Sequence, residues 1–208
     1  MNVLEKVTCF VMNAKQQLAL FQHPYAGVQI PAGTIELNEP PLEAALREAW
    51  EETGFRNFYD VHLLGTEDTV LPASQYATYQ QAPVYARPDL ESFNWATLRR
   101  GIYVEKEREC DDFAHITYRE YDQDVDPTYI TYQITGWVQR KTITNVLRRY
   151  FYVLHVDAEA DAAWSVMTDN HTFTVWWANP AEWQDVHSHQ IHWLKYLDEG
   201  VWKGEGGG

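Results

Sequence analysis

Apolar and polar positions alternate at the start of the chain in a way that predicts strands. Apolar runs at residues 7–12 and 17–21 flank a short polar segment, a pattern typical of a strand hairpin. Residues 29–33, Q-I-P-A-G, read as a short extended piece that leads into a glycine loop. The first part of the chain therefore predicts sheet strands that lead into this loop.

Between residues 38 and 53 the apolar positions change to the period of a helix. We expect Asn38 to cap its start and Gly54 to take the left-handed conformation after its end. One stripe of this helix is apolar or small, and we expect the sheet to bury it. The stripe consists of Leu42, Ala45, Leu46, Ala49 and Thr53.

The later chain predicts more strands around an irregular middle. Branched and aromatic runs predict strands at residues 61–64, 69–71, 113–118, 129–138, 146–156 and 172–178. Residues 72–100 are rich in turn signals without a clear period, so we expect a long loop or insertion there. A last short helix is expected at residues 190–197. The whole pattern predicts an α/β fold with a mixed sheet.

Composition supports one large domain and limits the class of ligand. The chain has 208 residues, 45% of them hydrophobic, which fits a single domain at 1–203 with an insertion at roughly 72–128 and a flexible tail at 204–208. Acids outnumber bases, giving a net charge of −14. This charge argues against long nucleic acid as a partner. It still allows a small phosphate ligand bound together with a divalent cation.

The cysteines and the lengths of the apolar runs indicate in which cellular compartment the protein is expected. Cys9 and Cys110 form no CxxC motif or disulfide framework, which is consistent with a reducing compartment. The N-terminal residues lack the pattern of a signal peptide, and no run of about 18 apolar residues predicts a membrane span. We therefore expect a cytoplasmic protein without a membrane partner.

The expected helix carries three closely spaced glutamates, Glu48, Glu51 and Glu52. Like charges one turn apart cost a helix about 0.2–0.5 kcal/mol per pair, so their grouping needs a reason. Carboxylates at this spacing suit a hard divalent cation such as Mg²⁺. Arg47 supplies a cation beside them. A solvated acidic face is the alternative reading of the same pattern.

Residues 33–55 resemble the Nudix box, G-x5-E-x7-R-E-U-x-E-E-x-G-U, in which U is a bulky apolar residue. The spacing fits throughout the box, and Ala49 is small for its apolar position. The matching residues are Gly33, Glu39, Arg47, Glu48, Ala49, Glu51, Glu52, Gly54 and Phe55. The resemblance implies the α/β/α sandwich of Nudix hydrolases.

The resemblance also implies metal-dependent hydrolysis of a nucleoside diphosphate linked to another group. Glu51 and Glu52 would bind Mg²⁺, with Mn²⁺ as a substitute, and Glu48 would bind metal or act as the base. Arg47 would orient Glu48, so the implied catalytic residues are Glu48, Arg47 and Glu52. The Gly33 carbonyl would face the metal, Glu39 would support the loop–helix junction or an outer metal position, and Gly54 would support the helix end. A homodimer also fits the family.

Two other functions stay open at this stage. One is a non-catalytic nucleotide-binding or regulatory Nudix domain. The other is an interaction module whose acidic helix is solvated.

Several residues outside the box are weaker candidates. Arg148, Arg149 and Asp169 are candidates for substrate or additional metal contacts. The H-S-H-Q-I-H segment at residues 187–192 is expected at the surface or the rim of a site rather than at zinc. The acidic run at residues 122–127 lacks the glycine and the final glutamate of a calcium loop, so we expect a turn there. Substrate selectivity is expected from residues 65–130 and 157–172.

Overall fold

The computed structural model describes residues 2–122, 126–158, 163–168 and 171–197. The chain divides into two compact units. The box unit comprises Lys6–Glu67 and Arg149–Gly208, and the insert unit comprises Met1–Glu5 and Asp68–Arg148. The insertion expected at 72–128 lies within the insert unit, and the expected tail at 204–208 lies outside the described residues.

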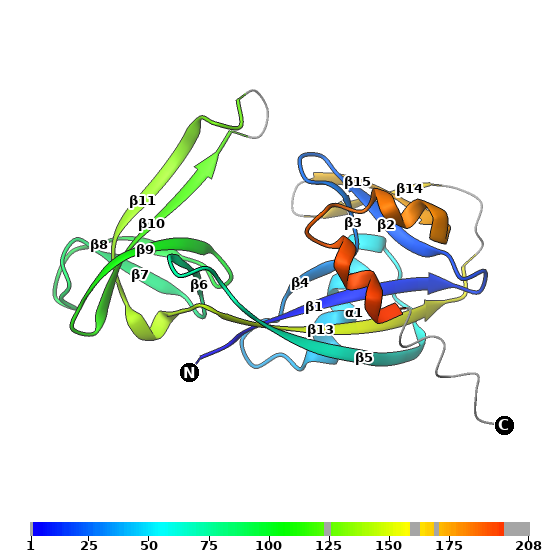
Figure 1. The fold of residues 1–208 in the computed structure, drawn as a ribbon, viewed down its shortest axis with the longest axis horizontal. Helices are drawn as coiled ribbons and strands as arrows, with labels where there is room; N and C mark the ends of the chain where they lie inside the picture. The colour runs from blue at the N-terminus through cyan, green and yellow to red at the C-terminus, as the bar shows by residue number, and fades with distance from the viewer. Residues whose placement is uncertain (1, 123–125, 159–162, 169–170, 198–208) are drawn as a thin grey trace. The chain divides into compact units, whose positions relative to one another are not determined.

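The box unit is built on a sheet with the strand order β14-β15-β2-β1-β13-β5, with β3 beside β2 and β4 beside β1. Figure 1 shows β1 and β13 pointing in the same direction, whereas β1 and β2 pair antiparallel. The sheet is therefore mixed, as predicted. Its elements are β1 (Leu4–Asn13), β2 (Leu18–His23), β3 (Gly27–Gln29), β4 (Ala32–Thr34), α1 (Pro41–Thr53), β5 (Tyr59–Val70), β13 (Val146–Val156), β14 (Trp164–Thr168), β15 (His171–Ala178), η2 (Pro180–Asp185) and η3 (Ile191–Leu194).

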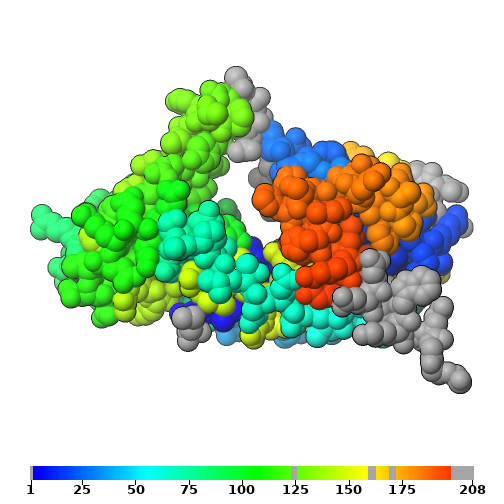
Figure 2. All heavy atoms as spheres, in the orientation of Figure 1, coloured from blue at the N-terminus to red at the C-terminus, as the bar shows by residue number. Residues whose placement is uncertain are grey.

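Helical layers cover both faces of this sheet. Alternate residues of β1 enter different cores: Val7, Cys9 and Val11 pack with α1, whereas Phe10 and Met12 pack with the segment around η2 and η3. Figure 2 shows that segment as orange and red spheres over one face of the unit. The α/β sandwich is confirmed, but in the described residues its second layer is mainly 3₁₀ helix.

The ends of α1 confirm one expectation and correct two. Gly54 has the expected left-handed conformation, with φ 82°, and its N–H donates to the Trp50 carbonyl at 2.7 Å. Asn38 does not cap the helix, because the position before the first turn belongs to Pro40, which makes no side-chain cap. Leu42 was expected to be buried, but it is 44% exposed, because the buried side of the helix consists of Ala44, Ala45, Glu48, Ala49 and Thr53.

The remaining elements of the box unit follow the sequence closely, with two differences. The hairpin of β1 and β2 is present, and β13 occupies the expected residues. The strands expected at 61–64 and 69–71 belong to one long strand, β5. β14 was not predicted. The late helix begins as η3 and continues as helix over residues 195–197.

The insert unit is a second sheet with the order β12-β6-β9-β10-β11-β7-β8. The expectation of a loop at 72–100 is wrong, because this range contains three short strands, of which two pair with each other and also join strands later in the chain. Their apolar side chains share a core with β10 and β11. The elements are β6 (Gln75–Thr78), β7 (Ala82–Tyr85), β8 (Asn94–Leu98), β9 (Tyr103–Cys110), β10 (Phe113–Tyr121), β11 (Ile130–Gln139), η1 (Arg140–Thr142) and β12 (Ile143–Thr144).

Candidate active site

The three glutamates of α1 line one cavity of about 380 Å³ in the box unit. Their spacing of three and four residues brings them to one side of the helix. Strands of the sheet supply the rest of the wall. The lining residues are His23, Gln29, Glu48, Glu51, Glu52, Thr168 and Phe173.

Arg47 ties the carboxylates of this region together. It binds Glu39 with two nitrogens, Nε to Oε1 at 2.8 Å and Nη2 to Oε2 at 2.9 Å. Its Nη1 lies 2.8 Å from Glu48 Oε1 and 3.2 Å from Glu51 Oε2. Nη2 also donates to the Thr34 carbonyl at 3.2 Å. One guanidinium therefore fixes three carboxylates and the strand before the helix.

Gly33 lies directly against Glu48. A Cβ added at Gly33 would stand 1.9 Å from the Glu48 carboxyl carbon and from one of its oxygens. The backbone of Gly33 is held in β4 by pairing with Val7 of β1. A glycine is needed here because the carboxylate occupies the space that any side chain would take.

The carboxylates also connect α1 to the loop before it. Glu52 Oε2 accepts a hydrogen bond from the Ala32 N–H at 2.8 Å. Glu39 Oε2 accepts one from the Glu36 N–H at 2.8 Å. These contacts hold β4 and the helix in a fixed relation, so the cavity wall is rigid on this side.

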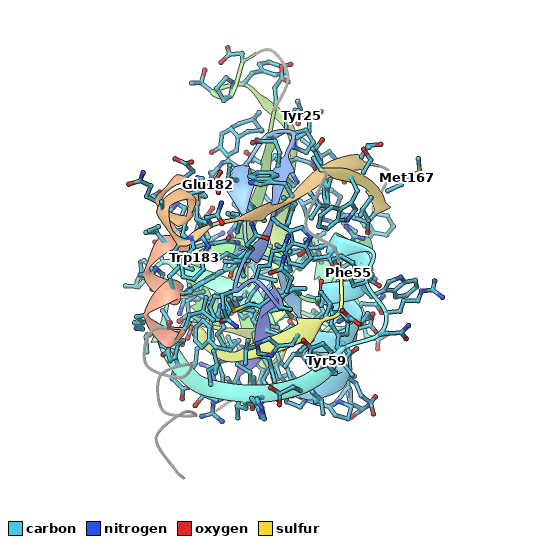
Figure 3. All side chains as sticks on the ribbon, turned by 90° about the vertical axis from the view of Figure 1, so that its right-hand side faces the viewer. Tyr25, Phe55, Tyr59, Met167, Glu182 and Trp183 are labelled. Atoms are coloured by element: carbon cyan, nitrogen blue, oxygen red, sulfur yellow. The ribbon has the colours of Figure 1, made fainter. Side chains whose placement is uncertain are left out.

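The end of α1 is anchored by aromatic packing. Phe55, which is labelled in Figure 3, packs against Trp164 and Trp177, with ring centroids 5.3 and 5.5 Å away. The Trp164 indole N–H donates to the Thr53 carbonyl at 2.7 Å. The last apolar position of the box thus fastens the helix to β14 and β15, which also contribute to the cavity.

Burial and the guanidinium shift the carboxyl pKa values in opposite directions. Hydrogen bonding from Arg47 lowers the pKa of Glu39 below its usual value. Burial raises the pKa of Glu48, although Arg47 opposes the shift. The bond to Glu39 in turn raises the pKa of Arg47, which keeps the guanidinium charged. A buried carboxylate with a raised pKa is a better proton acceptor than an exposed one.

A model of the NUDIX domain family matches residues 4–128, which is more than half of the chain. This span includes the whole box and its surrounding strands. The chain belongs to the Nudix family. The family resemblance predicted from the box at residues 33–55 is thereby confirmed. Members of this family act on phosphoric anhydride bonds.

One curated relative matches a short part of this Nudix chain. It is a "Probable DHNTP pyrophosphohydrolase" from Lactococcus lactis subsp. cremoris (strain MG1363), 48% identical over 42 residues. The match covers 20% of this chain and 25% of the relative. The shared segment is therefore a quarter of the relative's length.

Solved Nudix structures cover nearly all of the chain at low identity. A MutT protein from Methanosarcina mazei Go1 is 10% identical over 98% of this chain and 96% of its own, with a TM-score of 0.46. The NUDIX domain of Shewanella oneidensis NrtR, complexed with ADP ribose, is 13% identical over 97% and 90%, with a TM-score of 0.47. The E. coli dihydroneopterin triphosphate pyrophosphohydrolase is 10% identical over 95% and 94%, with a TM-score of 0.47.

The donor set of the Nudix box suits a divalent cation. Glu48, Glu51 and Glu52 offer carboxylate oxygens to one cavity, which is the chemistry that Mg²⁺ prefers. Among the residues that the structure describes, no group of three or more His, Cys, Asp or Glu is already arranged around a metal position. Instead, Arg47 holds two of these carboxylates. The metal roles of the three glutamates and of Gly33 stay predictions.

The arginines proposed outside the box do not line this cavity. Arg148 makes a two-nitrogen ion pair with Asp68, at 2.7 and 2.8 Å. Arg149 donates to the Val7 carbonyl and lies over the Trp193 ring at 4.1 Å. Both therefore have structural contacts. Asp169 lies outside the described residues.

The histidine-rich segment contributes no histidine to the lining of the cavity. The His187 and His189 rings are 5.0 Å apart, and His189 is exposed. His187 donates its backbone N–H to Val28 at 2.8 Å. Within the described ranges, none of these histidines joins a metal-type cluster, and no helix is long and apolar enough to cross a membrane.

Four cavity residues were not found by sequence reasoning: His23, Gln29, Thr168 and Phe173. They come from separate strands, and no fixed spacing links them to the box. Of the four, only Thr168 falls in a range that was expected to contribute to selectivity, residues 157–172.

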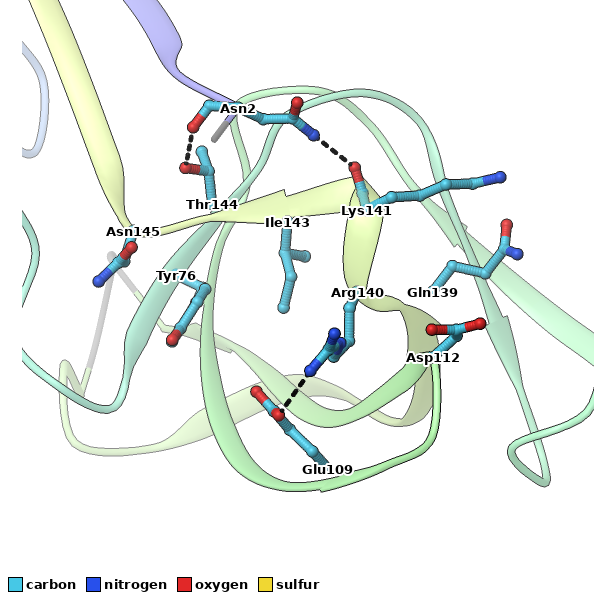
Figure 4. A pocket seen from close by; sticks show the side chains of 10 residues that line it. All are labelled: Asn2, Tyr76, Glu109, Asp112, Gln139, Arg140, Lys141, Ile143, Thr144 and Asn145. Atoms are coloured by element: carbon cyan, nitrogen blue, oxygen red, sulfur yellow. Dashed lines mark hydrogen bonds and ion pairs between the residues drawn. The ribbon is translucent and has the colours of Figure 1, made fainter.

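A larger cavity, of about 650 Å³, lies in the insert unit (Figure 4). Its wall is held by Asn2 bound to the Lys141 carbonyl and by Arg140 paired with Glu109. It contains no residue of the Nudix box. Its lining residues are Asn2, Tyr76, Glu109, Asp112, Gln139, Arg140, Lys141, Ile143, Thr144 and Asn145. The carboxylate chemistry, rather than cavity size, therefore distinguishes the candidate active site.

Proposed function

We propose that this Nudix protein hydrolyses the diphosphate linkage of a nucleoside diphosphate joined to another group, with Mg²⁺ or Mn²⁺ held by Glu51 and Glu52 and with Glu48 as the group that activates the water. The observation that supports this most strongly is the meeting of these three carboxylates at one cavity. The rigid link from Arg47 to Glu39 supports it further, because it fixes the wall on which chemistry would occur.

The residues of the site have distinct roles in the proposed reaction. A bound divalent ion would neutralise the diphosphate and lower the pKa of a water molecule. Glu48 accepts the proton of the attacking water. Arg47 engages Oε1 of Glu48, which leaves Oε2 as the oxygen that takes this proton. The water oxygen bonds to phosphorus while the bond from phosphorus to the bridging oxygen breaks.

Two aromatic rings that line the cavity suit a planar group. The His23 and Phe173 rings lie 5.4 Å apart, and Phe173 stacks on Phe21 at 4.8 Å. Two backbone N–H groups, of Tyr25 and Ala26, donate to His23 Nδ1, so the neutral ring carries its proton on Nε2. Aromatic rings at a cavity fit the flat ring of a nucleobase or a pterin. The name of the curated relative makes dihydroneopterin triphosphate a natural member of the substrate panel.

The test is a substrate panel with Mg²⁺ or Mn²⁺ and with EDTA, comparing wild type, Glu52→Gln and Glu43→Gln. The panel spans nucleoside diphosphate sugars, dinucleoside polyphosphates, oxidised nucleotides and dihydroneopterin triphosphate. Glu43 lies exposed on the same helix, so Glu43→Gln removes an equal charge outside the cavity. We expect EDTA and Glu52→Gln to abolish turnover, while Glu43→Gln keeps it.

Two outcomes point to other functions. Nucleotide binding that depends on Mg²⁺ and on Glu52, without turnover of any substrate, identifies the non-catalytic regulatory alternative. If calorimetry detects no binding of a divalent ion, both hypotheses are wrong, the metal-dependent enzyme and the regulatory domain. If Glu52→Gln is as active as wild type, its assignment as a metal ligand is wrong.

A further inference from the structure

The sheet of the insert unit has a core face and a solvent face. Ile116 and Tyr118 of β10 pack into the core of the unit. Thr117, Arg119 and Tyr121 alternate with them and therefore point to the opposite face. A cavity of about 320 Å³, here called the tyrosine cavity, lies on this solvent face over β6, β9 and β10. The side chains of this face that line it are those of Gln75, Tyr103, Glu105, Thr117, Arg119 and Tyr121.

Two tyrosines from neighbouring strands are exposed at this cavity. Tyr103 of β9 is 45% exposed and Tyr121 of β10 is 41% exposed. Glu105 pairs with Thr117 of β10, and both tyrosines lie beyond this pair, toward the same end of the two strands. An exposed tyrosine ring offers a flat apolar surface with a hydroxyl group at its tip. The two rings can therefore pack against the faces of a ligand ring.

A row of polar side chains crosses the sheet beside the tyrosines. Arg119 of β10 donates through Nε to Gln133 Oε1 of β11 at 3.2 Å, and its Nη1 binds Glu105 of β9. The Arg119 guanidinium is therefore fixed by partners on both neighbouring strands. Gln75 of β6 pairs with Glu105 and adds an amide to the row. These groups present hydrogen-bond donors and acceptors together, as a ligand rich in hydroxyl groups requires.

The charges at the tyrosine cavity cancel. Among the described residues that line it, Glu105 and Arg119 are the charged ones, and they pair with each other. A surface that binds single-stranded nucleic acid instead combines aromatic rings with a positively charged groove. The net charge of −14 on the whole chain opposes a polyanion further. The cavity therefore fits a ligand that is polar but uncharged.

We propose that the tyrosine cavity of the insert unit binds a neutral oligosaccharide. The C–H groups on the faces of a sugar ring pack on Tyr103 and Tyr121. The hydroxyl groups at its edge bond to Arg119, Glu105 and Gln75. In OB-folds, the exposed face of a small sheet binds oligosaccharides or oligonucleotides, and the balanced charge of this face favours the sugar.

The size of the cavity limits how much of the sugar it holds. Its volume of about 320 Å³ lies at the lower end of ordinary ligand sites, which measure about 300–1,000 Å³. It therefore suits a short stretch of a chain, with the rest of the sugar in solvent. None of its lining residues belongs to the Nudix box, so the proposal is independent of the reaction proposed for the box unit.

The test measures binding of cellohexaose, maltohexaose, xylohexaose and N-acetylchitohexaose to the full chain by isothermal titration calorimetry in EDTA. Without metal ions the result does not depend on the proposed reaction. Wild type is compared with Tyr103→Ala, Tyr121→Ala and Tyr132→Ala. Tyr132 is 50% exposed and pairs with Glu120, so it points to the other face of the same sheet and provides a matched control. Circular dichroism establishes that each variant is folded.

We expect at least one of the four sugars to bind wild type and Tyr132→Ala equally well. Tyr103→Ala and Tyr121→Ala should each weaken that binding roughly 10-fold, because each removes one ring from the cavity. Tyr103→Phe keeps the ring, so its affinity should stay within about twofold of wild type. The affinity should also stay constant between about 50 and about 500 mM salt, since a neutral ligand has no charge for salt to screen.

Three results would overturn the proposal. The first is that none of the four sugars binds to the wild-type chain. The second is that Tyr132→Ala weakens binding as much as Tyr103→Ala does, because the sugar then does not depend on the solvent face. The third is that a thymidine oligonucleotide binds more tightly than every sugar, with an affinity that falls as salt rises. That result would identify a surface for single-stranded nucleic acid.

Discussion

Gly33→Ala is the substitution that most directly tests how the site is built. The added Cβ would lie 1.9 Å from the Glu48 carboxylate, while ordinary contact begins at 3.4 Å. The carboxylate must therefore retreat by about 1.5 Å, since β4 is held to β1 by strand pairing. Glu48 is the movable partner because it contributes a side chain rather than backbone.

The displacement has two costs of different size. Moving Glu48 breaks its 2.8 Å bond to Arg47, and a hydrogen bond to a charged group contributes about 1.5–3 kcal/mol when fully buried. Arg47 keeps Glu39 and is 24% exposed, so we expect a loss of about 1 kcal/mol in unfolding free energy. The effect on turnover is larger, because a misplacement of about 1 Å at a reacting group lowers the rate roughly 100-fold.

A double-mutant cycle isolates the contact. Glu48→Ala removes the carboxylate that the new methyl group meets, so Gly33→Ala in that background should change unfolding free energy by less than about 0.5 kcal/mol. Urea denaturation in EDTA measures all four proteins without interference from metal. Steady-state kinetics on the best substrate measures Gly33→Ala against wild type.

The reasoning fails if Gly33→Ala retains wild-type turnover, because the carboxylate then has no need to leave its place. It also fails if Gly33→Ala lowers the unfolding free energy by the same amount in the wild-type background and in the Glu48→Ala background. In that case the strain comes from the backbone of β4 and not from the carboxylate.

Three further predictions concern other residues of the two units. Arg47→Lys should lower kcat roughly 10–100-fold in steady-state assays, because lysine lacks the planar fork that holds several carboxylates at once. Glu67→Gln should reduce unfolding free energy by at most about 1 kcal/mol at pH 7, since Lys195 lowers the Glu67 pKa. That stabilisation is complete above the usual carboxyl pKa of 4.5 and is lost as the pH falls below it, so the two urea curves should converge in acid. A thiol reagent should modify only exposed Cys110 in the native protein and both cysteines after unfolding, because Cys9 is buried and burial raises its pKa.

Local sequence was sufficient to predict the helix and the side that carries the glutamates. The period of the apolar positions and Gly54 define where α1 lies and ends, because both depend on neighbours within a few turns. Asn38 misled the prediction, because asparagine is a common helix-capping residue. Here it lies before two prolines, which set the start of the helix. The contact of Gly33 with Glu48 joins two elements, and helix spacing alone gives no sign of it.

The insert unit shows the limit of local patterns. β6 has only four residues, and its place is set by pairing Ala77 with Thr144 of β12 and with Tyr103 of β9. Strands this short carry too few alternating positions for a period to be visible. The cavity residues His23 and Phe173 are hidden for the same reason, because the sheet brings them together from distant strands.

The position of Arg47 explains how crowded glutamates remain together before any cation binds. Its Nε and Nη2 are committed to Glu39, while a single nitrogen, Nη1, is shared by Glu48 and Glu51. An arriving divalent ion would compete only for that shared nitrogen, because the anchor on Glu39 lies on the other side of the guanidinium. Glu39 therefore does more than support a loop. It keeps Arg47 beside the cavity when the carboxylates change partner, so that Nη1 can hold Glu48 and Glu51 again when the ion leaves.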